Sequence, residues 1–131
     1  MPEQPLPLEE GQELVRLYLS AWTERRSAAR RRLLERCWGD DADFSSWTTH
    51  VHGLDALDSH IAAGQRQHPR LVRRVLTSEV HVSSDKLSYT WALIEDDGNV
   101  LVEGSDWTQV GEDDRFIRVT SFAGRPQPAD A

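Results

Sequence analysis

The spacing of apolar residues predicts helices in the first half of the chain. From about residue 10 to residue 23 the apolar positions form a wide stripe, which indicates a helix covered on most sides. A second helix is predicted from Ser27, a residue type that caps helices, to Gly39. A short strand is expected at residues 43–48, and a third helix between Gly53 and Pro69.

In the second half the period of the pattern changes from about 3.6 residues to about 2. Four segments alternate in this way and predict strands at residues 71–83, 87–95, 100–110 and 115–122. Short turns separate them, so they are expected to form antiparallel hairpins. The predicted fold class is therefore α+β, with three helices packed on one face of a curved, largely antiparallel sheet.

Alternation along the third long strand places one acidic residue on the face that the helices cover. That face comprises Val100, Val102, Gly104, Asp106, Thr108 and Val110. A carboxyl group surrounded by apolar side chains loses hydration, which favours its neutral, hydrogen-bond-donating form. Asp106 is therefore a candidate acid, although it could equally accept from a backbone amide or a nearby arginine.

Several aromatic residues are expected to surround Asp106. In the preceding strand Tyr89 and Trp91 share the inward face with Leu87 and Leu93. In the first helix Tyr18 lies one turn before Trp22. A buried tyrosine hydroxyl needs a partner, and Asp106 is the natural one for Tyr18.

The histidines give weaker signals. His60 borders the apolar face of the third helix, where it could act as a base at a pocket mouth or simply bond a backbone carbonyl. His50 and His52 flank one residue of a loop, and a polar loop is a better explanation than a metal site. His81 is expected on the convex face of the sheet. No metal site is predicted.

Composition narrows the class of protein. The chain has 131 residues, 22 acidic and 15 basic side chains, one cysteine and a net charge of −7. These values fit one acidic domain and argue against general binding to nucleic acid or to an anionic membrane. No transmembrane or signal segment is expected, and a single cysteine fits the cytoplasm. The arginine cluster from Arg25 to Arg36 is interpreted as a solvated helix face.

Longer stretches carry a family resemblance. The segment SYTWALIEDDGNVLVEGSDWTQVGEDDRFIRVTSFAG resembles the C-terminal half of the nuclear transport factor 2-like superfamily, with the SnoaL-like polyketide cyclases and ketosteroid isomerases most similar. LVRLYLSAW, LLERCWGDDADF and HGLDALDSHI fit its helical half. The resemblance covers residues 10–124 and leaves residues 1–9 as a disordered N-terminal tail and 125–131 as a C-terminal tail. It implies a cone of three helices in a strongly curved mixed sheet that encloses a pocket.

The resemblance also suggests roles for individual residues. Tyr18 matches the helical tyrosine, and Asp106 the late-strand aspartate, of the oxyanion hole in the steroid isomerases. The separate catalytic base of those enzymes has no counterpart, because Ser45, Ser46 and Trp47 stand there instead. In the SnoaL-like cyclases the late-strand aspartate is an acid/base in ring closure, which Asp106 fits better. Such chemistry usually needs no cofactor, and none is predicted.

The sequence therefore supports two hypotheses about function, from different classes. The first is a SnoaL-like isomerase or cyclase acting on a hydrophobic, oxygen-bearing small molecule, with Asp106 and Tyr18 as catalytic residues. Its ligand-binding residues would be Trp22, Phe44, His60, Tyr89 and Trp91. The alternative is a non-catalytic ligand-binding or dimerisation module. An outward-facing Trp107 predicts a homodimer through the outer sheet face. A nucleic-acid accessory role through the arginine cluster is a third and weaker hypothesis.

Overall fold

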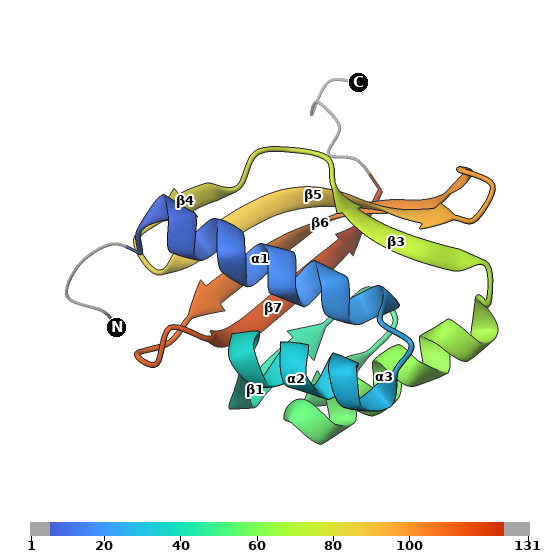
Figure 1. Cartoon of the computed structure of the whole chain (residues 1–131). Coiled ribbons are helices and arrows are strands. Elements are labelled where there is room, and N and C mark those ends of the chain that lie inside the picture. The colour runs from blue at the N-terminus through green and yellow to red at the C-terminus, as the bar shows by residue number, and fades with distance from the viewer. Residues whose placement is uncertain (1–5, 125–131) are drawn as a thin grey trace.

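Three helices are present where the pattern places them. The computed structural model describes residues 6–124 of the chain, and its helices are α1 (Leu8–Thr23), α2 (Ser27–Cys37) and α3 (Leu54–Gln67) (Figure 1). Folded structure begins earlier than residue 10, because Leu6 is buried and donates its backbone N–H to Ser84 O at 3.2 Å. Residues 1–5 and 125–131 of the expected tails lie outside the described residues.

The strands form one mixed sheet. They are β1 (Trp38–Ser45), β2 (His50–His52), β3 (Leu71–Leu76), β4 (His81–Ser83), β5 (Lys86–Glu95), β6 (Val100–Val110) and β7 (Phe116–Ala123). The order is β2-β1-β7-β6-β5-β3, with β4 also paired to β5. β1 runs parallel to β7, and the other pairs are antiparallel. The α+β class and the mixed sheet are confirmed.

Two strand predictions are wrong in detail. The segment at residues 71–83 forms two strands, because the Ser78 side chain accepts the Thr90 backbone N–H at 2.8 Å and replaces a ladder partner between them. The loop that holds His50 and His52 contains a strand of its own, which pairs with β1. β1 itself begins at Trp38, directly after α2, and not at residue 43.

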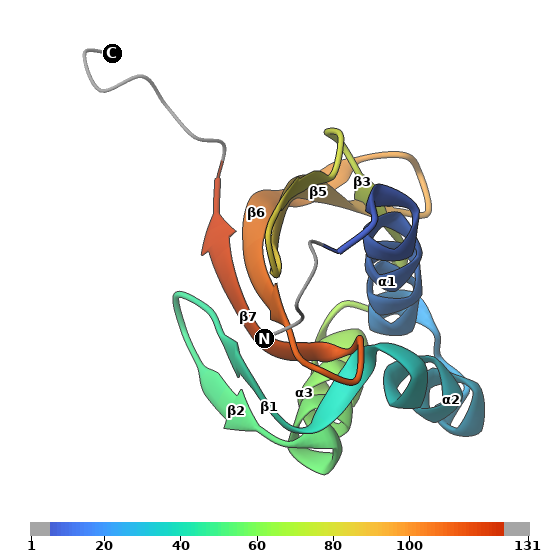
Figure 2. The ribbon, with the colours of Figure 1, turned by 90° about the vertical axis from the view of Figure 1, so that its left-hand side faces the viewer.

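The helices lie together on one side of the sheet, which Figures 1 and 2 show from two directions. Between them and the sheet lies a core that contains two fully buried tryptophans, Trp38 and Trp91, and two buried tyrosines, Tyr18 and Tyr89. Each aromatic side chain of this size buries roughly 150–250 Å², which makes it a large part of the core of a small domain. Within the described part of the chain, no helix is long and apolar enough to span a membrane.

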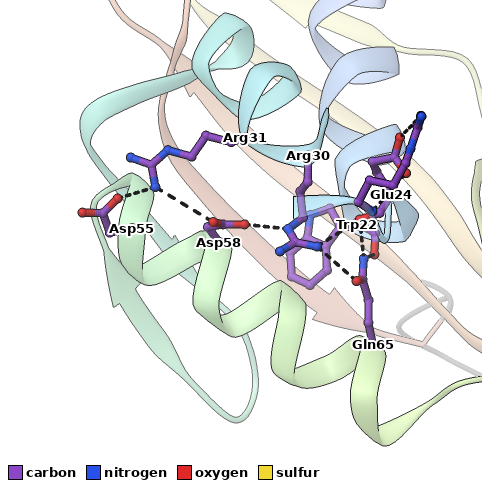
Figure 3. A network of polar contacts seen from close by, with 8 residues as sticks. Trp22, Glu24, Arg30, Arg31, Asp55, Asp58 and Gln65 are labelled. Carbon is purple, nitrogen blue, oxygen red and sulfur yellow. Dashed lines mark hydrogen bonds and ion pairs between the residues drawn. The ribbon is translucent and has the colours of Figure 1, made fainter. Parts of the chain in front are cut away.

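A buried polar network joins the three helices (Figure 3). The Arg30 side chain is almost fully buried and donates to Asp58 Oδ1 at 2.5 Å, to Gln65 Oε1 at 3.2 Å and to the backbone oxygen of Glu24 at 3.1 Å. The Gln65 amide in turn donates to the backbone oxygens of Trp22 and Glu24, both at 3.0 Å. The network thus fixes the end of α1 against α3, and with it the position of Trp22.

The arginine cluster is therefore only partly a solvated face. Arg30 is buried, and Arg25 donates to four backbone oxygens where α3 leads into β3: those of Gln65, His68, Pro69 and Leu71. Both guanidinium groups hold segments of this chain together.

Candidate functional site

Asp106 lies at the centre of the inward face of the sheet. Its side chain is fully buried, as alternation along β6 predicts. The register places Tyr89 of β5 and Ser121 of β7 directly opposite it on either side, and Trp91 diagonally across. Cross-strand neighbours on one face point their side chains the same way, so all of them can reach the carboxyl group.

Three of these neighbours donate hydrogen bonds to Asp106. The Tyr89 hydroxyl donates to Oδ2 at 2.8 Å, while Trp91 Nε1 and Ser121 Oγ donate to Oδ1 at 2.8 and 2.7 Å. A carboxylate only accepts hydrogen bonds, so three converging donors suit the ionised group. The surroundings are thus more polar than the sequence pattern suggests, and they do not resemble a dry apolar site for a neutral acid.

A fourth group completes this cluster. Arg74 extends from β3 with only 4% of its side chain exposed, and its Nη2 lies 3.8 Å from Asp106 Oδ2. Its Cζ lies over the indole rings of Trp22 and Trp91, 4.2 and 4.0 Å from their centroids. Cation–π contacts of this kind are strongest where water is excluded. Two tryptophans and one carboxylate therefore compensate for the buried positive charge.

Beside Arg74 lies a cavity of about 230 Å³. Four of the predicted ligand-binding residues line it, namely Trp22, Phe44, His60 and Trp91. Arg74 and Ser121 also line it, as do apolar residues of β3, β5 and β6. Asp106, Tyr18 and Tyr89 are not among the lining residues. The structure thus brings most of the predicted ligand-binding residues together around one cavity, but Asp106 does not line that cavity.

Comparison with solved structures gives the type of fold. An isomerase of the SnoaL-like family from Agrobacterium tumefaciens, whose activity is itself only proposed, matches with a TM-score of 0.83 and 22% identity over 89% of this chain and 99% of that one. A proposed polyketide cyclase from Sinorhizobium meliloti has a TM-score of 0.64 and 14% identity over 88% and 99%. A proposed ketosteroid isomerase from Kribbella flavida has a TM-score of 0.64 and 16% identity over 92% and 84%.

The chain has a SnoaL-like fold. This agrees with the nuclear transport factor 2-like superfamily that the sequence resembles. No family profile matches the sequence, and no curated protein matches it. Structural matches at such low sequence identity establish the fold alone. Any chemistry has to be argued from this chain's own residues.

The expected bond between Tyr18 and Asp106 is absent from this SnoaL-like fold. The Tyr18 hydroxyl makes no hydrogen bond to Asp106, and Tyr89 is the tyrosine that bonds it. Tyr18 stacks on Trp38, with ring centroids 5.9 Å apart. Burial, followed by the nearby charge of Asp106, raises the pKa of Tyr18 well above its usual value. Its environment is that of a core residue.

The histidines divide into a cavity residue and a surface pair. His60 packs against the rings of Trp22 and Phe44, and burial together with the charge of Arg74 lowers its pKa. On the surface, His50 and His52 both contact Asp43 Oδ1, and the hydrogen bond that the His52 ring donates to Asp43 raises the pKa of His52. No group of three or more metal-ligating side chains occurs within residues 6–124.

Arg74 and Ser121 are two of the cavity residues that sequence reasoning did not predict. A register shift in β3 between Leu71 and Arg73 inserts one extra residue, so that Arg74 turns to the same face as Leu71. The signal that could have found it is the pair Arg73–Arg74 inside a strand. Successive strand residues face opposite ways, so one of the two arginines had to face the helices.

Gly104 gives a test of how the site is held. A Cβ at this position would lie 2.5 Å from the backbone oxygen of Phe122 and 2.8 Å from Trp91 Cη2. The Gly104→Ala variant should therefore displace the Trp91 ring and lose about 1–3 kcal/mol of stability through overpacking. The measurements are urea denaturation and the NMR signal of the Trp91 indole N–H, which should lose its hydrogen-bonded shift.

The matched control is Gly64→Ala in α3, where a Cβ would meet no atom within 4 Å. That variant should gain about 0.5–1 kcal/mol from the better helix propensity of alanine. An unchanged indole signal and unchanged stability in Gly104→Ala would contradict the close packing of Trp91 on β6.

Proposed function

We propose that this protein binds a small, largely apolar molecule in the cavity beside Arg74. The observation that carries the proposal is the cavity itself, which aromatic rings line and which has one buried guanidinium in its wall. An apolar pocket with a few fixed polar groups is the usual form of a small-molecule site. In this proposal the cavity is the pocket of the closed cone that the resemblance implies.

Binding explains the position of Asp106 better than direct acid catalysis does. Asp106 is fully buried and both of its oxygens accept hydrogen bonds from the protein, so a ligand in the cavity does not reach it. We assign Asp106 the role of a positioning residue that orients Trp91 and retains Arg74. Tyr18 has a packing role in this proposal.

The proposal is tested by filling the cavity. Gly64 lines it, and a side chain there would enter open space. With the neutral probe 2-naphthamide, calorimetry should show one binding site per chain, and Gly64→Leu should weaken binding by about tenfold or more because the leucine occupies the site.

Ser59→Leu is the control, since it introduces the same side chain at an exposed position of the same helix. It should bind the probe as the unsubstituted protein does. Failure of naphthalene-sized amides to bind the unsubstituted protein, or equal binding by Gly64→Leu, would refute the proposed site.

One observation favours proton transfer as a second candidate function. Ser121 lines the cavity and donates to Asp106 Oδ1 at 2.7 Å, so its hydroxyl connects the cavity to the buried carboxylate. In such a relay Ser121 Oγ takes a proton from an acidic C–H of the ligand while passing its own proton to Asp106. An enolate remains, and the reverse transfer returns the proton.

The relay predicts that the protein accelerates exchange of the α-protons of 2-tetralone in D₂O, followed by NMR. Ser121→Ala should lose that acceleration because it removes the connecting hydroxyl. Thr120→Ala, the neighbouring position on the opposite strand face, should keep it. Exchange no faster than in buffer, or exchange that survives in Ser121→Ala, would rule the relay out.

We also propose that two copies associate through the outer face of the sheet. Trp107 is 62% exposed and Phe122 is 50% exposed, and the β6–β7 register makes them diagonal neighbours on that face. Adjacent exposed aromatics are typical of protein interfaces.

Analytical ultracentrifugation should therefore show a dimer that Trp107→Lys converts to a monomer, because a charge would be buried in the interface. Val100→Lys, at an exposed apolar position at the start of β6, should remain dimeric. A monomeric unsubstituted protein would contradict the proposed interface.

A further inference from the structure

The charges around the cavity differ from those of the whole chain. The protein has 22 acidic against 15 basic residues, yet none of the described residues that line the cavity is acidic. Arg74 brings a positive charge to this wall, whereas the lowered pKa of His60 favours its neutral form. A wall that excludes carboxylates in an acidic protein favours a negatively charged ligand.

Arg74 has donors to offer such a ligand. A guanidinium carries five N–H donors, and the structure gives Arg74 no hydrogen bond to any described residue. Its Nε is fully buried without a partner, and its one ion pair, to Asp106, is 3.8 Å long. Unpaired donors in a buried group are costly, so a ligand that pairs them gains affinity.

The two tryptophans limit how that ligand can approach. With Trp22 and Trp91 stacked against the guanidinium at 4.2 and 4.0 Å, acceptors have to come to its edges. A carboxylate matches a guanidinium edge because its two oxygens lie in one plane and can accept two parallel hydrogen bonds. A single carbonyl oxygen would pair fewer of the available donors.

Asp106 does not itself accept hydrogen bonds from the N–H donors of Arg74. Its oxygens already accept from Tyr89, Trp91 and Ser121 at 2.7–2.8 Å, whereas Arg74 is beyond hydrogen-bond distance. Its charge helps to retain Arg74 among apolar rings without using the N–H groups. It also lowers the net positive charge that a ligand meets, so the ligand's carboxylate has to be recognised by hydrogen bonds as well as by charge.

We infer that the ligand is a small apolar monocarboxylate, held by its carboxylate at an edge of Arg74 and by its apolar part against Phe44 and the tryptophan rings. The cavity of about 230 Å³ lies below the roughly 300–1,000 Å³ that hold drug-sized ligands. This favours a molecule of about the size of an aromatic acid. The inference rests on the proposed function and names its ligand class.

The experiment compares two probes of the same shape, 2-naphthoate and neutral 2-naphthamide, by calorimetry at pH 8. The acid should bind the unsubstituted protein about tenfold or more tightly than the amide, as charged hydrogen bonds predict. In Arg74→Gln the acid should lose this advantage, so that the ratio of the acid affinity to the amide affinity, both measured on the same variant, falls towards one. Arg74→Lys should restore only part of it, because lysine keeps the charge and lacks the planar fork.

His60 provides a readout that needs no variant. Burial and the charge of Arg74 lower the pKa of its imidazole below 6.5. A bound carboxylate would offset the charge of Arg74, so the NMR titration of His60 should move to higher pH with the acid than with the amide. Both probes bury the His60 imidazole to the same extent, so burial contributes no difference between the pKa values measured with the two probes.

The outcomes separate failure of the proposed small-molecule site from failure of the inferred preference for carboxylates. If neither probe binds, the proposed function fails, and the inference about the ligand fails with it. If both bind equally and His60 titrates alike with both, the cavity binds small molecules and the preference for carboxylates is refuted. Should Arg74→Gln fail to fold, the affinity ratio and the His60 titration in the unsubstituted protein still decide the question.

Discussion

The buried carboxylate of Asp106 is the constraint on which the rest of the site depends. It lies on β6 and binds donors from β5 and β7, while Arg74 of β3 lies close to it. One carboxyl group thereby connects the side chains of four strands. Because a buried charge is costly unless donors surround it, these strands must hold the register that brings the donors together.

The cavity follows from this arrangement. The bond from Trp91 Nε1 to Asp106 fixes the indole ring, which packs on the bare backbone of Gly104 and also stacks against Arg74. Trp22 covers Arg74 from the helices, and the Arg30 network holds the end of α1 that carries it. Stability and binding thus use the same residues, and the guanidinium in the cavity wall keeps its hydrogen-bond donors free.

Sequence reasoning predicts the helices, the long strands and the inward face of β6, because the hydrophobic period is a local property. It also finds four of the cavity's aromatic and histidine residues. The pair Arg73–Arg74 implies that one arginine faces inward, but sequence reasoning does not identify Arg74 as that residue, because one extra residue in β3 decides which of the two it is. Sequence reasoning pairs Asp106 with Tyr18, because a buried hydroxyl needs a partner and because of the resemblance. The strand register instead selects Tyr89, and register depends on contacts distant in sequence.

The central claim is that Asp106 and Arg74 form one buried electrostatic unit. A double-mutant cycle with Asp106→Asn and Arg74→Met, measured by urea denaturation, tests it most directly. Each single variant should lose about 3–5 kcal/mol, because it leaves the other charge buried without compensation. The double variant should be less destabilised than the sum of the two by about 1 kcal/mol or more. Additive losses would contradict the account and would leave two independent buried charges.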